Sequence, residues 1–328
     1  MGETQWRKLG LAVAAAGGDL GRTHAMLPTP LIRKDTIRVL FASCDGTMRG
    51  RIFAAELDRQ HPERVVELDN RPVLDLGEPA AFDADGVNPS QLVERDAALW
   101  LYYIGWRRHS RQVPYTLFAG LAISEDGGKS FRRRSTEPIL APCSEERYFR
   151  TAPHVFWNGE EWEMLYIGGG TFLTAAGGKR LPLYSLRRTT SEDGIVWDRP
   201  GEELLSPDPA EDEIGFGRPH VWHDEHGEAA LLISVRTRQG YTLHQVGAVD
   251  GQLCRREVLP RSDFGWDSEM ACFGAPCLDR ERQRELLFYN GNGFGRTGFG
   301  IAERAGIETD PGSYISMVVN LIRAEDRH

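Results

Sequence analysis

The sequence lacks long apolar runs and paired cysteines. No apolar stretch reaches the ~18 residues that a membrane-spanning helix needs. The 5 cysteines are scattered and contain no CxxC pair, so their spacing indicates neither a disulfide framework nor a zinc knuckle. Segment 7–16 resembles a weak signal peptide, with a basic pair before apolar residues, but its apolar part is short and Ala-rich. We therefore expect a cytoplasmic protein without a membrane partner.

An excess of positive charge is also missing. The chain has 39 Lys and Arg against 48 Asp and Glu, which gives a net charge of −9. A protein that binds a nucleic-acid polymer usually carries a surplus of basic residues that neutralise phosphates, so we do not expect such a partner. The 328 residues are 41% hydrophobic and 27% charged, which is typical of a globular protein. The sequence leaves the oligomeric state open.

Convincing helical periodicity is absent, and a repeat is present instead. A proline, a short hydrophobic stretch, a polar turn and a strand rich in aromatic and branched residues recur about every sixty residues. The prolines are Pro30, Pro89, Pro153, Pro219 and Pro276. Third strands follow at 52–57, 117–123 and 183–188. Two of these lead into S-x-D-G turns, in which we expect Asp to cap its own backbone and a later aromatic residue to pack back.

Short strands in repeats of this length predict an all-β fold, a single five-bladed β-propeller, rather than a two-sheet sandwich. We predict one domain over 1–328, with blades at approximately 24–60, 80–135, 148–200, 213–258 and 267–303. Segment 6–13 has no repeat of its own, so we assign it as the strand that closes the fifth blade. Residues 311–328 form a tail, with a helical turn expected at 318–323.

The residues just before each repeated proline are the natural candidates for a site. In a propeller the innermost strands line a central channel, and the residues that enter these strands meet at one mouth. Ionisable groups that converge in such a hollow are typical of a binding or catalytic site. The candidates at the entrances are His24, Asp83, Asp85, Arg150, Arg218, His220 and Glu269.

Several phrases resemble a known superfamily. FDADGVNPSQLV, SEDGIVW, GRPHVW and DSEMACFGAP are similar to the five-bladed propeller superfamily of arabinanases, invertases and levansucrases. Within it the chain looks most like an uncharacterised bacterial group of glycosidase-like proteins associated with sugar biosynthesis. The resemblance covers nearly the whole chain and implies glycoside chemistry by three carboxylates.

The three-carboxylate pattern of that superfamily is incomplete in this chain. The first entrance has His24-Ala25-Met26 where the resemblance implies an Asp, and the third has Thr151 after Arg150 where it implies another. Glu269 is the best counterpart of the general acid. Glycoside cleavage needs a proton donor and a second carboxylate as base or nucleophile, and Asp83 and Glu269 are the predicted pair. His24 is the third catalytic candidate, as an acid or base.

The remaining candidates are predicted to bind the substrate. Arg150 and Arg218 suit an anionic group, so we expect a small anionic or nucleotide-linked sugar, with His220, Asp85 and Asn292 as further contacts. Trp106 could stack on a sugar face. Each has a structural alternative: the arginines as ion pairs between blades, Asp83 and Asp85 as turn caps, and Trp106 as a core aromatic.

The sequence thus favours a glycoside-hydrolase-like enzyme that needs no cofactor. The histidines at the mouth have no metal-ligand spacing, so no metal site is predicted. Two other functions stay open because the expected aspartates are missing. One is a non-hydrolytic biosynthetic enzyme that performs elimination, isomerisation or transfer in the same pocket. The other is a sugar-binding propeller without catalysis.

Overall fold

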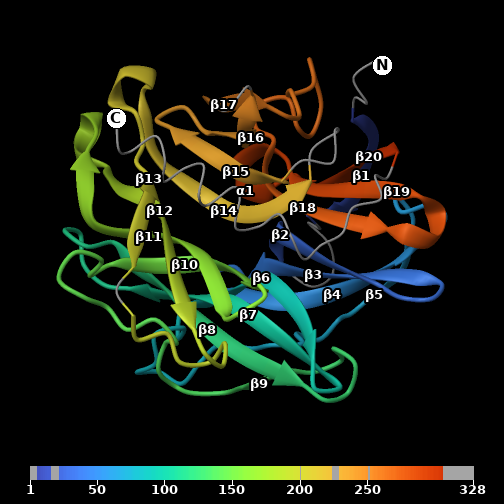
Figure 1. The fold of residues 1–328 in the computed structure, drawn as a ribbon, viewed down its shortest axis with the longest axis horizontal. Helices are drawn as coiled ribbons and strands as arrows, with labels where there is room; N and C mark the ends of the chain where they lie inside the picture. Colours follow the sequence, from blue (N-terminus) through green and yellow to red (C-terminus); the bar gives the residue numbers. More distant parts are fainter. Residues whose placement is uncertain (1–5, 16–21, 200, 224–228, 250–251, 306–328) are drawn as a thin grey trace.

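The structure is a computed structural model that describes residues 6–15, 22–199, 201–223, 229–249 and 252–305. The predicted tail and its helical turn at 318–323 lie outside the described residues. Nearly all described secondary structure is β (Figure 1). The strands are β1 (Arg7–Ala14), β2 (Thr23–Ile32), β3 (Thr36–Cys44), β4 (Gly50–Asp58), β5 (Val65–Leu68), β6 (Gly86–Arg95), β7 (Ala98–Arg108), β8 (Tyr115–Ser124), β9 (Arg132–Arg133), β10 (Phe149–Trp157), β11 (Trp162–Thr174), β12 (Arg180–Ser191), β13 (Glu202–Leu205), β14 (Glu213–His223), β15 (Ala229–Thr237), β16 (Tyr241–Val249), β17 (Gln252–Glu257), β18 (Cys272–Asp279), β19 (Arg284–Asn290) and β20 (Gly298–Ala305). The helix α1 (Asn292–Gly295) and three 3₁₀ turns (Ala176–Gly178, Pro209–Glu211 and Arg280–Arg282) complete the described elements.

The strands form successive antiparallel groups of four. Strands β2–β5, β6–β9, β10–β13 and β14–β17 each pair with the next strand along the chain. The last group contains β18, β19 and β20, and its fourth strand is β1 from the N-terminal part of the chain. The segments predicted as third strands lie within β4, β8 and β12.

Neighbouring groups are joined by very short parallel contacts. Gly50 on β4 pairs with Gly86 on β6, and Tyr184 on β12 pairs with Gly215 on β14, while β8 and β10 share two such pairs. These contacts link 16 strands into one sheet, and β1, β18, β19 and β20 form a separate sheet of 4 strands. The hydrogen-bonded ladder is therefore not closed among the described residues.

The main hydrophobic clusters lie between groups that follow one another. One cluster joins Leu40 and Ile52 of the first group to Tyr103 and Phe118 of the second. Another joins the first group to the last, through residues such as Phe41, which lies 5.7 Å from Phe299 between ring centroids. A sheet with an apolar face must bury that face against a neighbouring sheet. Packing thus brings β2 and β18 side by side (Figure 1).

The first strand of each group carries a bulge at the same place. The register shifts at Met26/Thr29 in β2, Pro89/Gln91 in β6, Thr151/His154 in β10, Gly217/His220 in β14 and Cys272/Ala275 in β18. Left-handed residues accompany four of these shifts: Leu27, Ala152, Arg218 and Phe273. Bulges redirect side chains and often occur next to functional sites. Here the bulges bend the first strand of every group at a corresponding position.

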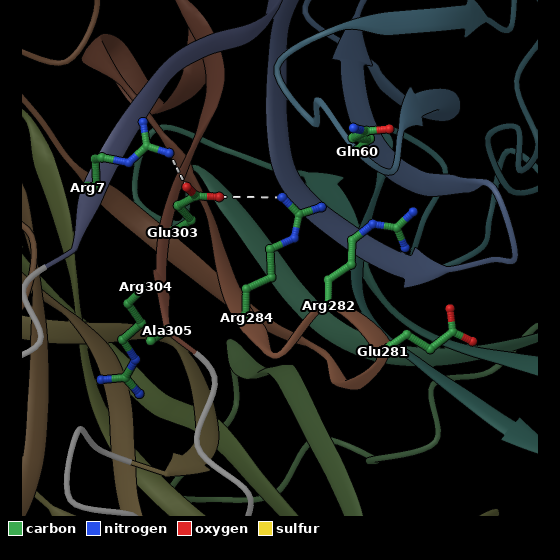
Figure 2. A pocket seen from close by; sticks show the side chains of 8 residues that line it. All are labelled: Arg7, Gln60, Glu281, Arg282, Arg284, Glu303, Arg304 and Ala305. Atoms are coloured by element: carbon green, nitrogen blue, oxygen red, sulfur yellow. Dashed lines mark hydrogen bonds and ion pairs between the residues drawn. The ribbon is translucent and has the colours of Figure 1, made fainter.

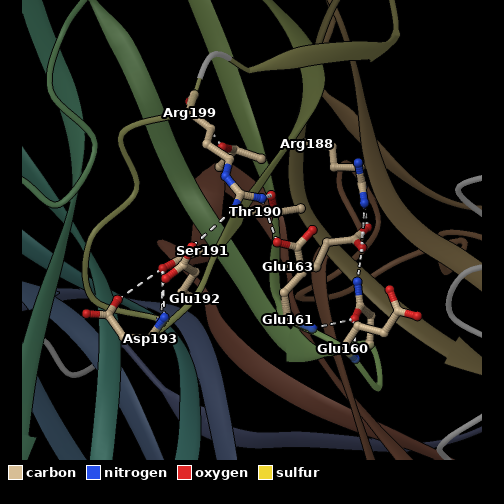
Figure 3. Close-up of polar contacts among 12 residues, drawn as sticks. Glu160, Glu161, Glu163, Arg188, Thr190, Ser191, Glu192, Asp193 and Arg199 are labelled. Atoms are coloured by element: carbon tan, nitrogen blue, oxygen red, sulfur yellow. Dashed lines mark hydrogen bonds and ion pairs between the residues drawn. The ribbon is translucent and has the colours of Figure 1, made fainter.

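The S-x-D-G turns have the predicted conformation. The Asp193 carboxylate accepts hydrogen bonds from the backbone N–H groups of Ile195 and Val196 at 2.8 and 2.9 Å, and Gly194 has a φ of +72°. Trp197 is buried and donates to the Gly194 carbonyl at 3.1 Å. Figure 3 shows this turn beside two ion pairs, Glu163 of β11 with Arg188 of β12, and Glu161 with Arg199. The turn at 124–131 repeats the cap with Asp126.

Candidate functional site

A cavity of about 440 Å³ lies where the first strands of all the groups meet. Its lining includes Leu27 of β2, Asn88 of β6, Ala152 of β10, Gly217 of β14 and Phe273 of β18. Aromatic side chains supply much of the wall: Trp106, Tyr115, Tyr184, Phe216, Tyr241, Phe273 and Phe294. A hollow with apolar walls and a few polar groups is the usual form of a small-molecule site. Of the predicted site residues, it contains His24, Asp85, Trp106 and Arg218.

Arg218 lines this cavity and has a relative exposure of 1%. Its guanidinium donates to the Phe273 carbonyl at 2.9 Å, to Thr29 Oγ1 at 2.7 Å and to the Ser90 carbonyl at 3.3 Å. Arg218 therefore ties β14 to β18, β2 and β6. No described carboxylate pairs with it, and its Nε lacks a hydrogen-bond partner, as does the buried Thr151 Oγ1 beside the cavity. Burial lowers the pKa of Arg218 to about 9, because the cation is desolvated without a counter-charge.

Arg236 on β15 is a second cation in the wall without a described carboxylate partner. Its guanidinium carbon lies 5.6 Å from the ring centroid of Tyr184 and 5.5 Å from that of Tyr241, and it donates to the Tyr184 hydroxyl. Burial raises the pKa of Tyr115, Tyr184 and Tyr241, and this effect outweighs that of the Arg236 charge, which lowers it. These phenols are therefore protonated near neutral pH, and this wall presents O–H and N–H donors.

Asp85 and His24 are the titratable candidates for proton transfer in the cavity. Asp85 lies in the loop before β6, where its Oδ2 accepts the Arg108 backbone N–H at 3.0 Å and its Oδ1 lies 3.9 Å from Arg49 Nε. His24 Nδ1 lies 2.8 Å from Thr23 Oγ1. Burial, and then Arg296, lower the pKa of His24, so its ring is uncharged near neutral pH and can accept a proton. His24 also has a φ of +67°, a strained conformation that is common at functional sites.

Other groups in the cavity do not suggest metal or thiol chemistry. Burial, together with Asp45, raises the pKa of Cys44 to about 11, so its thiol is protonated and weakly nucleophilic. In the described ranges, no group of three or more His, Cys, Asp or Glu residues could hold a metal ion.

The carboxylate of Asp83 lies outside the cavity. It is completely buried, and it forms an ion pair with Arg133 Nε at 2.7 Å and accepts the Tyr103 hydroxyl at 2.9 Å. A sugar in the cavity does not meet this group. The catalytic role predicted for Asp83 finds no support in this position, because its visible contacts hold the loop before β6 against β7 and β9.

The same arrangement recurs in two other groups, which explains Asp83 as part of the repeat. Glu146 accepts the Tyr166 hydroxyl at 3.1 Å and pairs with Arg150 at 3.3 Å. Asp267 accepts the Tyr289 hydroxyl at 2.9 Å and pairs with Lys8 at 2.7 Å. We call each carboxylate–tyrosine–cation set a clasp. The tyrosines of the three clasps occupy a common sequence position: Tyr103-Ile104-Gly105, Tyr166-Ile167-Gly168 and Tyr289-Asn290-Gly291.

The remaining predicted residues also lie away from the cavity lining. Arg150 belongs to a clasp, which agrees with its alternative as a structural ion pair. His220 is buried beside His154, with 4.7 Å between ring centroids. Glu269 is exposed, and Asn292 Oδ1 accepts the backbone N–H groups of Glu269 and Met270 at 2.7 and 3.0 Å. Asn292 therefore fixes two loops together, and Asp83 and Glu269 are not brought together at this cavity.

A larger hollow of about 920 Å³ lies elsewhere, beside β1, β19 and β20 (Figure 2). The carboxylates of this hollow have arginine partners: Glu303 pairs with Arg7 and, at 3.4 Å, with Arg284. Glu281 at its edge pairs with Arg59 at 2.8 Å. We assign the site to the central cavity instead, because two of its arginines lack a described carboxylate partner.

Sequence reasoning missed the tyrosines and Arg236, although a signal was present. Three of the third strands contain a repeated motif, Tyr115-Thr116-Leu117, Tyr184-Ser185-Leu186 and Tyr241-Thr242-Leu243. An alignment of these strands places the three tyrosines at one level. Arg236 has no such signature, because its role depends on which tyrosine rings surround it.

No family model matches this sequence. The chain is 30% identical over 308 residues to the "Uncharacterized protein Rv1502" of Mycobacterium tuberculosis strain H37Rv. The alignment covers 90% of this chain and 98% of that protein. A protein of a second strain of that species, MT1551, is also 30% identical, over 307 residues.

Solved structures share the fold at low sequence identity. A structure described as a glycoside hydrolase superposes with a TM-score of 0.69 at 17% identity, over 95% of each chain. A β-1,2-mannobiose phosphorylase from Listeria innocua has a TM-score of 0.64 at 11% identity, over 95% of this chain and 97% of that chain. The fold is therefore all-β and propeller-like, and it is shared with these solved structures. The identity and coverage shared with the mycobacterial protein establish that this chain belongs to the Rv1502 family.

Proposed function

We propose that the protein is a carbohydrate-active enzyme whose active site is the central cavity. In this proposal the five groups of four strands are the blades of a propeller, closed by the pairing of β1 with β20. The core cluster between the first and last groups supports this closure. The cysteines at 44, 143, 254, 272 and 277 are all free, which supports a reducing, cytoplasmic compartment. In the described ranges, no helix is long and apolar enough to cross a membrane.

The observation that carries the proposal is the pair of arginines without described carboxylate partners in an aromatic-lined hollow. Buried charges are normally paired, and Arg218 and Arg236 both line the cavity. A small anionic sugar, free or nucleotide-linked, would supply the missing negative charge. The aromatic rings would pack on its apolar faces, as Trp106 does on Tyr115 at 4.3 Å between ring centroids.

Asp85 and His24 provide the proton transfers for cleavage of a glycosidic bond. The uncharged His24 takes the proton of the attacking nucleophile, and Asp85 takes up a proton from solvent and passes it to the leaving oxygen. The electron pair of the C–O bond leaves with that oxygen, and the new bond forms at the anomeric carbon. The bulges in β2 and the turn before β6 position these two groups on the same cavity.

The test is turnover of anionic glycosides in water enriched in ¹⁸O, with Asp85→Asn and His24→Gln as variants. Hydrolysis puts solvent oxygen into the product, and both variants are expected to lose most of the turnover while they still bind the sugar. Binding of intact glycosides without any turnover would contradict the enzyme proposal and favour a sugar-binding protein.

Transfer to an acceptor other than water is the second candidate function. The cavity lining contains one carboxylate among the described residues, Asp85, whereas hydrolysis by paired carboxylates needs two. A structural neighbour is described as a phosphorylase. Turnover that depends on an added acceptor, with no ¹⁸O in the product, would support transfer and contradict hydrolysis.

A further inference from the structure

The cavity has an excess of positive charge, although the chain as a whole has a net charge of −9. Its lining contains Arg108, Lys179, Arg218 and Arg236 against the single carboxylate of Asp85. Arg108 donates to the carbonyls of Thr47 and Met48, so this contact does not neutralise its charge. Arg108 and Lys179 are exposed to solvent, so the charges that a ligand has to balance are those of Arg218 and Arg236, and more than one negative charge is needed to balance both.

The wall around Arg236 is also rich in hydrogen-bond donors. The guanidinium N–H groups only donate, and each phenol hydroxyl can donate as well as accept. An oxyanion only accepts, and it can use several such donors at once. Thr151 Oγ1 and Arg218 Nε add two buried polar atoms without partners to the same cavity. This set of donors suits a group with several acceptor oxygens.

We propose that Arg236, with the hydroxyls of Tyr115, Tyr184 and Tyr241 and with Arg218 of the same cavity wall, forms a subsite for a phosphoryl group. This inference rests on the proposed function, since it names the anionic group that the substrate brings. A phosphoryl group carries up to two negative charges near neutral pH and has three acceptor oxygens. It therefore balances both arginines, whereas a carboxylate balances one and leaves a buried cation unpaired.

The subsite binds a part of the substrate that does not itself react. Arg236 and Tyr241 come from β15 and β16, Tyr184 from β12 and Tyr115 from β8, while His24 and Asp85 come from β2 and the loop before β6. In this proposal the phosphoryl group is held by side chains of the second, third and fourth groups of strands, and the glycosidic bond lies near His24 and Asp85. Binding energy from such a remote group positions the bond for reaction.

Calorimetry with matched ligands tests the subsite. The probes are glucose 1-phosphate, inorganic phosphate, glucuronate and glucose, each titrated into the wild-type protein, Arg236→Met and Arg134→Met. Arg134 is exposed and outside the cavity lining, so its variant removes the same charge without touching the subsite. We expect the phosphorylated ligand to bind about tenfold or more tightly than glucuronate. Arg236→Met should lose about 30-fold in this affinity, and Arg134→Met should lose none.

Tight binding of the sugar phosphate but not of inorganic phosphate places the phosphoryl group on the substrate. Equal binding of both, with turnover that requires phosphate, identifies free phosphate as the ligand. Glucuronate that binds as tightly as the phosphate, or an Arg236→Met protein that folds normally by circular dichroism and keeps its affinity, overturns the subsite. If Arg236→Met fails to fold, Tyr241→Phe replaces it, with an expected loss of about fivefold, and unchanged affinity there has the same meaning.

The two proposals fail in different ways. Binding of a sugar phosphate that depends on Arg236, without turnover of any glycoside, retains the subsite and removes the enzyme. Turnover of neutral glycosides that is unchanged in Arg236→Met retains the enzyme and removes the subsite.

Discussion

The hydroxyl of Tyr103 donates a hydrogen bond of 2.9 Å to the buried carboxylate of Asp83. Burial, together with Asp83, raises the pKa of Tyr103, so the phenol keeps its proton for this bond. Arg133 on β9 completes the clasp, and the clasps of Glu146 and Asp267 have the same composition. A carboxylate that looks catalytic in the sequence is thus part of the repeated framework.

Asp83→Asn should therefore act on stability. Removing the negative charge leaves Arg133 without its partner, and we expect the free energy of unfolding to fall by about 2 kcal/mol. Urea unfolding followed by circular dichroism measures this change. A variant as stable as the wild type but without turnover would instead restore the catalytic interpretation of Asp83.

Asp85→Asn should act on turnover rather than on stability. Its side chain lines the cavity and is partly exposed, so we expect turnover to fall about 10²- to 10⁴-fold with little change in stability. Glu269→Gln is the matched control, because Glu269 is an exposed carboxylate outside the lining. Loss of turnover in Glu269→Gln, with full activity in Asp85→Asn, would reverse the assignment.

Acid should destabilise the protein before its carboxylates titrate. Burial, and then Arg218, lower the pKa of His154 to about 3, and burial with His154 and Arg218 lowers that of His220. Both histidines ionise near 6.5 in the unfolded chain, so the unfolded state binds more protons as pH falls below that value. Stability should be complete above about pH 6.5 and decline toward about pH 3, by up to about 1.4 kcal/mol per pH unit for each histidine.

The window between about pH 6.5 and 5 isolates this effect from most carboxylates. Urea unfolding at several pH values should give a shallower decline for His220→Leu than for the wild type. Identical slopes for the two proteins would show that these histidines are not the groups responsible.

Anion binding in the cavity should weaken in alkali. Burial lowers the pKa of Arg218 to about 9, and an anion binds the charged form. Above about pH 9 the affinity for a charged ligand should therefore fall, by up to about tenfold per pH unit. Calorimetric titration between pH 7 and 10.5 measures this dependence. An affinity that is constant across this range would mean that Arg218 stays charged without a ligand.

The contact between the first and last groups of strands should depend on Asn290. Its Oδ1 accepts the Leu27 backbone N–H and its Nδ2 donates to the Ala25 carbonyl, each at 2.7 Å, so it fastens β19 to β2. Asn290→Leu leaves two buried backbone groups without partners, which should lower the free energy of unfolding by about 2 to 4 kcal/mol. Thermal unfolding measures the loss, and an unchanged transition would contradict this role.

Much of the local structure could be predicted because it depends on nearby residues. Gly194 and Asp193 make their turn through contacts within a few positions, and branched and aromatic runs form strands wherever one face is buried. The site was harder to predict. His24, Asp85, Trp106 and Arg218 line the cavity, whereas Asp83 and Glu269 do not, and the functional roles of all six stay predictions.

The sequence by itself determined the all-β character, the repeat and its turns, because these follow from periodicity and from short-range backbone preferences. Only the tertiary structure decided which charges are paired. Asp83 and Arg133 are 50 positions apart, and Arg218 meets Thr29 and Phe273 from distant strands, so the packing of whole sheets determines which ionisable groups are neutralised internally and which remain for a ligand.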